Sequence, residues 1–85
     1  MKDWVKFKIL LDEQYDWPAE YLFKFIIPKK EKDLLVQILL GHQIKTRPSK
    51  TGKYISVTST KTFNSSDEVI EVYQKVQIID GLMSL

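Results

Sequence analysis

The most distinctive reactive groups in this chain are basic side chains gathered in one segment. Between Gln43 and Phe63 there are five of them and no acid. Ammonium and guanidinium groups bind carboxylates and phosphates, so this segment predicts a surface for an acidic protein or a phosphate-bearing molecule. A second interpretation is that the same charges stop exposed strands from pairing edge to edge. The five are Lys45, Arg47, Lys50, Lys53 and Lys61, and the candidate interaction surface consists of Lys45, Arg47, Lys50, Lys53 and Tyr54.

Catalytic chemistry is not predicted for the rest of the chain. The single histidine, His42, follows Gly41 at the end of an expected helix, and no Ser, Cys or metal partner stands at a recognisable spacing from it. Adjacent acids on a helix point in different directions, so the pairs at 12–13 and 67–68 do not make a shared carboxylate site. The segment 49–53 lacks the first glycine of a phosphate-binding loop. We therefore expect no catalytic, cofactor-binding or metal-ligating residue, and a protein that is not an enzyme.

Length and charge place the chain among small globular domains. Its 85 residues suffice for one domain with one modest core, and a net charge of +2 is too small to require a nucleic-acid partner. The charges are unevenly distributed, however. Five of the eleven acids lie between Asp3 and Glu20, three lie between Asp67 and Glu71, and none lies between Asp33 and Asp67. We therefore expect a molecule with one acidic and one basic side.

The sequence gives no indication of secretion or of a membrane segment. There is no cysteine, which excludes disulfides and thiolate chemistry. The first residues do not form a basic region followed by an apolar run, as a signal peptide would. The longest charge-free stretch, Leu34–Ile44, is far shorter than the ~18 apolar residues that a membrane-spanning helix needs. We expect a cytoplasmic protein.

Hydrophobic periodicity and helix-breaking residues predict the elements that position these groups. Ser65 stands three residues before Glu68, the spacing of a capping box, and Gly52 supplies the positive φ of a hairpin turn at 49–52. Trp4, Phe7, Leu10 and Leu11 recur at helical spacing, so the first helix should pack on the domain, or else bind a partner. In chain order we predict a helix over 3–14, a strand over 21–27, a helix over 30–40, a hairpin over 43–63, a helix over 66–78 and a short strand over 82–85.

After the first helix, the predicted order β-α-β-β-α-β is typical of an α+β, ferredoxin-like fold. Its antiparallel sheet has the strand order 4-1-3-2 and carries both helices on one face. Residues 1–16 would be a helical lead and 17–85 a single domain. The lead should cover the second sheet face, which carries Leu22 and Ile26, and the far end of the third strand should be less buried because it contains Ser59 and Lys61. The predicted buried residues are Phe23, Phe25, Leu35, Ile38, Leu39, Ile55, Val57, Val69, Tyr73 and Val76.

Two runs of residues in this chain resemble the YbeD-like family of small proteins of unknown function. The first is Trp17-Pro18 with Tyr21–Pro28, and the second is Arg47–Thr58, which contains S-x-x-G-K-Y-x-S-V-T. This family is similar in fold to the ACT regulatory domains, so the resemblance implies an ACT-related fold and a regulatory or ligand-sensing role. It implies no catalytic residues. The loop 28–32 lacks the glycine that amino-acid-binding ACT domains generally have after the first strand.

Two functional hypotheses follow from the sequence. The first is a small regulatory or adaptor module that binds a protein partner or a small effector, as a monomer or a homodimer and without a cofactor. The second is weak, sequence-tolerant binding of RNA or DNA through the basic hairpin and the open sheet face. RNA-recognition domains of this fold use at least two spaced aromatics, whereas here Tyr54 is followed by Ser56, Thr58 and Thr60.

Overall fold

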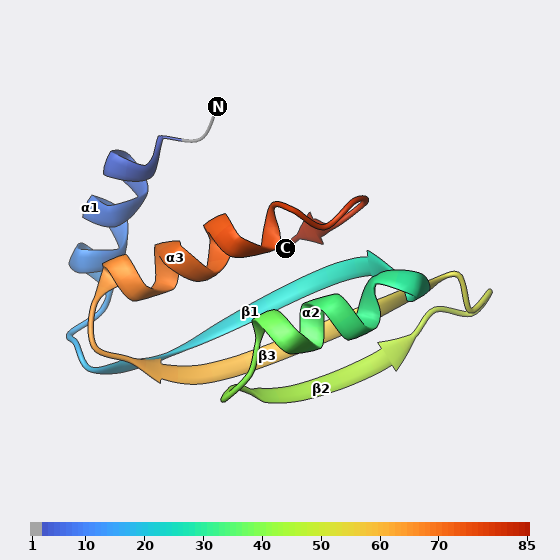
Figure 1. Cartoon of the computed structure of the whole chain (residues 1–85). Helices are drawn as coiled ribbons and strands as arrows, with labels where there is room; N and C mark the ends of the chain where they lie inside the picture. Colours follow the sequence, from blue (N-terminus) through green and yellow to red (C-terminus); the bar gives the residue numbers. More distant parts are fainter. Residues whose placement is uncertain (1–2) are drawn as a thin grey trace.

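A computed structural model describes residues 3–85 as an α+β structure with one antiparallel sheet of four strands (Figure 1). Met1 and Lys2, which belong to the predicted helical lead, lie outside the described residues. The predicted elements are all present, with boundaries that differ by a few residues. The elements are α1 (Trp4–Gln14), β1 (Ala19–Pro28), the 3-10 turn η1 (Lys29–Glu31), α2 (Lys32–Ile38), β2 (Gln43–Pro48), β3 (Tyr54–Phe63), α3 (Ser66–Val76) and β4 (Met83–Ser84).

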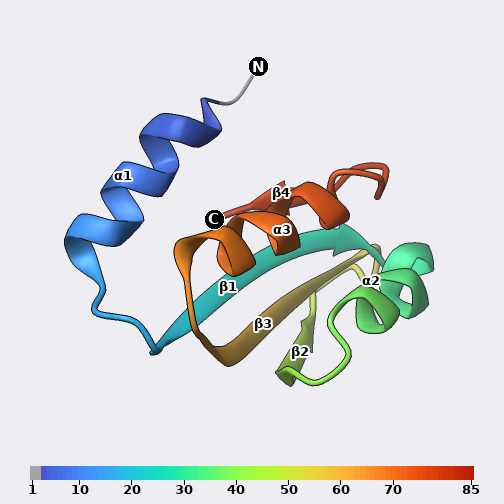
Figure 2. The same ribbon diagram turned by 60° about the vertical axis from the view of Figure 1, so that its left-hand side comes forward.

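The strands lie side by side in the order β2-β3-β1-β4, which is 4-1-3-2 when followed from the β4 edge. β1 pairs with β3 along its whole length, from Ala19 opposite Phe63 to Pro28 opposite Tyr54. These two ten-residue strands therefore form the centre of the sheet, and the shorter β2 and β4 form its edges. In Figures 1 and 2, α2 and α3 lie on the same side of the sheet.

The core lies between that side of the sheet and the helices. Alternation along β1 buries Phe23, Phe25 and Ile27 completely. Of the ten residues predicted to be buried, nine are buried and Ile38 is only partly so. Ile38 is the last residue of α2, where the helix ends against the open depression beside His42. The core also contains Ile27 and Leu11, as the strand alternation and the stripe of the first helix predict, together with four residues that were not predicted: Phe63, Ile70, Val72 and Ile79.

In the far half of β3, Ser59 and Phe63 are buried but Lys61 is not, so the prediction from Ser59 and Lys61 is wrong for the serine. Ser59 has no exposed surface and Phe63 is 2% exposed, whereas Lys61 reaches solvent. Ser59 lies opposite Phe23 of β1 and Ile44 of β2, so larger neighbours cover the small side chain. Its position in the sheet decides its burial.

α1 does not cover the second sheet face, which corrects the prediction for the helical lead. It packs instead beside α3, on the helix side of the sheet (Figure 2). The ring of Phe7 lies 5.5 Å from that of Tyr73, edge to face, and Leu11 is 3% exposed. Leu10, which was predicted to lie on the same packed stripe, is 53% exposed, because it lies about 100° around the helix axis from Leu11. Leu22 on the other sheet face stays 56% exposed. The aromatic cluster around Tyr73 offers Phe7 and Leu11 a better-packed site than the mixed face around Leu22 does.

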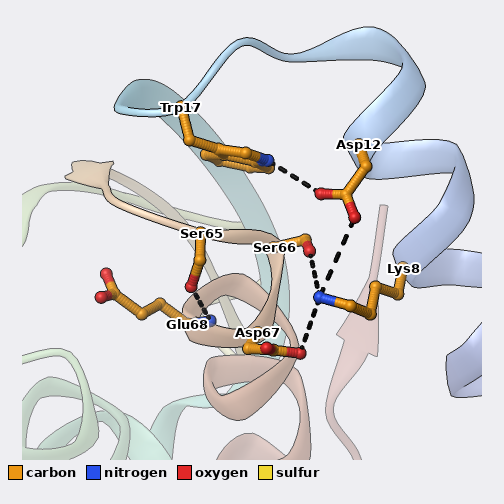
Figure 3. Close-up of polar contacts among 7 residues, drawn as sticks. All are labelled: Lys8, Asp12, Trp17, Ser65, Ser66, Asp67 and Glu68. Atoms are coloured by element: carbon orange, nitrogen blue, oxygen red, sulfur yellow. Dashed lines mark hydrogen bonds and ion pairs between the residues drawn. The ribbon is translucent and has the colours of Figure 1, made fainter.

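Lys8 holds α1 against the start of α3 (Figure 3). Its Nζ donates to Ser66 Oγ at 2.9 Å and to Asp67 Oδ1 at 3.0 Å, and it lies 3.9 Å from Asp12 Oδ2. The indole Nε1–H of Trp17 donates to Asp12 Oδ1 at 2.9 Å. The hydrogen bond from Ser66, followed in size by that from Trp17, lowers the pKa of Asp12. Asp12 and Asp67, one acid from each of the adjacent pairs at 12–13 and 67–68, thus connect α1 to the domain.

The predicted cap of α3 is confirmed, with one difference in its partners. The Glu68 backbone N–H donates to Ser65 Oγ at 3.4 Å. The Glu68 carboxylate accepts from the backbone N–H of Asn64 at 3.0 Å, one residue earlier than a standard capping box would have it. Two N–H groups that have no partner inside the helix are thereby satisfied.

Candidate interaction surface on the open sheet face

Within residues 3–85, no helix lies over the sheet surface opposite α2 and α3 (Figures 1 and 2). We call this surface the open face. Because side chains alternate along a strand, it is formed by the even-numbered residues of β1 and β3 and the odd-numbered residues of β2. The exposure of the strands agrees, since the odd-numbered residues Ile55, Val57 and Ser59 of β3 are buried on the helix side.

Three cations of the open face lie on adjacent positions. Lys45 of β2 and Lys24 of β1 both face Thr58 of β3, so the three residues form one row across the sheet. At about 4.8 Å per strand, the backbones of the two lysines are about 10 Å apart. Arg47, two residues along β2, is opposite Ser56 in the next row. All three cations are exposed, and no ion pair joins any of them to another described residue.

Apolar and hydroxyl side chains surround these cations. Leu22 and Met83 are each 56% exposed, and Tyr54 is 49% exposed at the start of β3. The only acid in the four strands, Glu20, is opposite Thr62 at the far end of the sheet. The open face is therefore basic in its middle and partly apolar, and Ser56, Thr58, Thr60 and Thr62 run along its central strand.

The structure divides the predicted surface into two parts. Lys45, Arg47 and Tyr54 share the open face, whereas Lys50 and Lys53 lie in the loop between β2 and β3 and are exposed at the hairpin tip. There the Gly52 N–H donates to the Ser49 carbonyl at 3.0 Å, and Gly52 has the predicted positive φ, at 76°. Lys61, the fifth base, instead lies on the helix side with its Nζ 5.6 Å from the ring centre of Phe63.

Lys24 is the residue of this surface that the sequence reasoning missed. The alternation of β1 places it on the face opposite the core, together with Leu22 and Ile26. Its position beside Lys45 depends on the register of β1 with β3 and of β3 with β2. Short-range patterning does not contain that register, since one residue of slip would move Lys24 to the other face.

His42 has a serine partner that lies far from it in the sequence. Its Nδ1 lies 2.7 Å from Ser59 Oγ, and its ring packs 6.1 Å from that of Phe23 and 5.7 Å from that of Phe63. The two residues are 17 positions apart in the sequence, so no short spacing pattern predicts the contact. Burial lowers the pKa of His42, and the positive charge of Lys61 lowers it further, which favours the neutral form of the imidazole. Because Ser59 has no exposed surface, its hydroxyl cannot reach a substrate as a nucleophile.

A depression of about 380 Å³ lies beside His42, where the end of β3 meets α2 and α3. Its wall includes Lys61, Glu71 and Lys75. The Lys75 ammonium lies 2.9 Å from Glu71 Oε1 and lowers the pKa of that carboxyl. Among residues 3–85 there is no group of three or more His, Asp or Glu side chains that could hold a metal ion. In the same part of the chain, every helix is too short or too polar to cross a bilayer.

Comparison with known proteins gives a match to a protein family. The family model described as "Protein of unknown function (DUF493)" matches residues 12–85, a span that contains the whole sheet, α2, α3 and the last residues of α1. No curated protein matches the chain. No solved structure matches it either.

Proposed function

The chain belongs to DUF493, the YbeD family of proteins of unknown function, and we propose that it is a non-enzymatic regulatory or adaptor module that binds an acidic protein surface through the open face. The family match confirms the resemblance seen in the sequence. Four antiparallel strands in the order β2-β3-β1-β4 with α2 and α3 on one side support a ferredoxin-like, ACT-related architecture as part of this proposal.

The observation that carries the proposal is the cluster of Lys24, Lys45 and Arg47 on the open face. These cations lie among the exposed apolar side chains of Leu22 and Met83, and within the described chain they have no acid to neutralise them. Strand formation does not require lysine or arginine at these positions. Apolar area beside unpaired positive charge suits an acidic protein surface, since the charges guide the approach and the apolar groups are buried on contact.

Nucleic-acid binding is the alternative, and the open face has little of what it needs. Tyr54 is the only aromatic side chain on this face, and the central strand continues with Ser56, Thr58 and Thr60. Base stacking supplies much of the affinity for single strands, so one aromatic leaves mainly phosphate contacts. Such binding would be weak and would fall steeply with salt.

A small effector is a second candidate, favoured by the depression beside His42. That depression has room for a small polar molecule and contains both cationic and anionic side chains. An effector seated there would change the nuclear magnetic resonance signals of the His42 imidazole and leave those of the open face unchanged. The two ligand types are therefore separable by the residues that respond.

The test replaces the open-face cations together, as Lys24→Gln, Lys45→Gln and Arg47→Gln. A matched control, Lys29→Gln, Lys30→Gln and Lys32→Gln, removes the same charge from exposed residues beyond the end of β1. A second variant, Lys50→Gln with Lys53→Gln, separates the hairpin tip from the face. Binding of fluorescent poly-glutamate and of single-stranded oligouridine is measured by anisotropy as salt is raised through about 0.1 M, where the Debye length is about 10 Å.

We expect wild type and the control to bind the acidic polypeptide more tightly than the oligonucleotide, and the open-face variant to lose that binding. Retention of binding by the folded, monomeric open-face variant would refute the proposal. Tighter binding of the oligonucleotide would favour the nucleic-acid alternative. If the hairpin-tip variant keeps binding but begins to aggregate, Lys50 and Lys53 serve to prevent edge pairing.

A further inference from the structure

α1 has apolar residues on two sides, and only one of these sides is covered. Phe7 and Leu11 pack toward α3 and its aromatic neighbours. On the other side Val5 is 71% exposed, and Ile9 and Leu10 are each 53% exposed. A helix on the surface of a domain normally keeps its apolar residues on the buried stripe. Three large apolar side chains on the solvent side of one short helix are therefore unusual and indicate a contact surface.

Opposite charges stand at the two ends of this exposed side. At about 100° per residue, Lys6 and Glu13 both lie within about 60° of Ile9 around the helix axis. They are seven residues apart, or about 10.5 Å along the axis, too far to pair with each other. Both are exposed, and neither forms an ion pair with any other residue in the range 3–85. The exposed side is thus positive at one end, apolar in the middle and negative at the other end.

We propose that this side of α1 is a dimer contact, and that it packs antiparallel against the same side of α1 in a second copy of the chain. In an antiparallel pair centred between residues 9 and 10, Lys6 of each copy meets Glu13 of the other, and Ile9 meets Leu10. We call Val5, Lys6, Ile9, Leu10 and Glu13 the α1 stripe.

The occupant is a second copy because the α1 stripe complements itself. In a dimer with two-fold symmetry, both subunits use the same surface, so that surface must be complementary to itself. A stripe that is positive at one end, apolar in the middle and negative at the other end is complementary to itself only when the two helices are antiparallel. The position of the helix permits the contact. In Figures 1 and 2, α1 lies beyond the end of the sheet with only α3 beside it, so a second helix can reach its far side.

The size of the helix predicts a weak and reversible dimer. An eleven-residue helix is about 16 Å long, and two of them bury much less than the about 800 Å² per partner of a standard stable interface. We expect a dissociation constant between about 10 μM and about 1 mM. The contact leaves both open faces free, so that a dimer would present two basic faces to one partner.

Reversing the charge of Lys6 or of Glu13 tests the contact without altering the fold, since both residues are exposed. Lys6→Glu and Glu13→Lys are made separately, and the self-association of each is measured by sedimentation equilibrium up to about 1 mM. In each variant alone, like charges face each other at both ends of the stripe, and we expect dimerisation to weaken about tenfold. An equimolar mixture of the two variants restores both opposite-charge pairs and should dimerise as wild type does. Lys32→Glu on α2 is the matched control, with no expected effect.

A second variant examines the apolar part of the stripe. Ile9→Gln with Leu10→Gln should abolish dimerisation while circular dichroism and the urea midpoint stay near those of wild type, because both residues are already exposed. A wild-type chain that is monomeric up to about 1 mM would overturn the proposal. It would also be overturned if the mixed charge variants failed to recover, because another protein or a lipid surface would not show mutual rescue.

Discussion

Ser59→Ala removes the hydroxyl that the structure places 2.7 Å from His42 Nδ1. The methyl group of alanine fits the buried site, so no cavity is made and the change isolates the hydrogen bond. A hydrogen bond between neutral groups contributes about 0.5–1.5 kcal/mol net, and a buried nitrogen left without a partner costs about 1–3 kcal/mol. Because His42 is only half-buried and water can replace part of the bond, we expect a loss of about 1–2 kcal/mol in the free energy of unfolding.

That loss is large for a chain of this size. At about 0.05–0.15 kcal/mol per residue, an 85-residue domain has a free energy of unfolding of about 4–13 kcal/mol. With an m-value of about 1–2 kcal/mol per molar urea, the unfolding midpoint of Ser59→Ala should fall by about 1 M. A double-mutant cycle with His42→Leu assigns the loss to the pair, since Ser59→Ala should cost much less when the imidazole is already absent.

The same imidazole makes stability depend on pH in a known direction. Burial lowers the pKa of His42 in the folded chain below the about 6.5 of an unfolded histidine, so between the two values only the unfolded chain binds the proton. Stability contributed by the neutral imidazole is therefore present above pH of about 6.5 and is lost as the pH falls through this window. The paired carboxyls of Asp12 and Glu71 have pKa values lowered from 3.8 and 4.5, so they affect the pH dependence of stability only at more acidic pH.

The assay is urea unfolding at several pH values from about 5 to about 8, followed by tryptophan fluorescence and circular dichroism. Wild type should lose stability as the pH falls from about 7 to about 5, and His42→Leu should show a flatter profile in that range. If Ser59→Ala left the midpoint unchanged, the hydrogen bond would not stabilise the fold. A pH profile identical in wild type and His42→Leu would refute the buried, neutral imidazole.

Two further predictions compare matched substitutions in the sheet and its turns. Phe23→Ala, at a ring with no exposed surface, should lower the free energy of unfolding measured in urea by about 3–5 kcal/mol. Tyr54→Ala, at a half-exposed ring on the open face, should lower it by less than about 1 kcal/mol. Equal losses would refute the assignment of the two residues to opposite faces of the sheet. Gly81→Ala should lower the melting temperature more than Gly52→Ala. Both residues have positive φ, but only at Gly81 would a Cβ meet another side chain, at 2.9 Å from Pro28 Cγ. A larger effect at Gly52 would contradict the packing of the turn before β4 against Pro28.

The local features of this protein follow from short stretches of its sequence. Period-two alternation placed Phe23 and Phe25 in the core, the spacing of Ser65 and Glu68 located the start of α3, and Gly52 marked the hairpin turn. These features depend on backbone preference and on the period of a helix or strand, which act within a few residues. The family resemblance was likewise visible in the sequence, where it rests on two short runs of residues. The match over residues 12–85 confirms it.

Contacts between distant residues depend on how the strands and helices pack. Lys24 lies in one row with Lys45 only because β1 and β2 pair with opposite sides of β3 in one register. Ser59 is a buried partner of His42 because its strand runs beneath the end of α2, and a serine has no pattern of its own that predicts burial. α1 joined α3 and not the open face because packing against Tyr73 outweighed the nearer apolar residues, and competition between two surfaces is a property of the folded molecule.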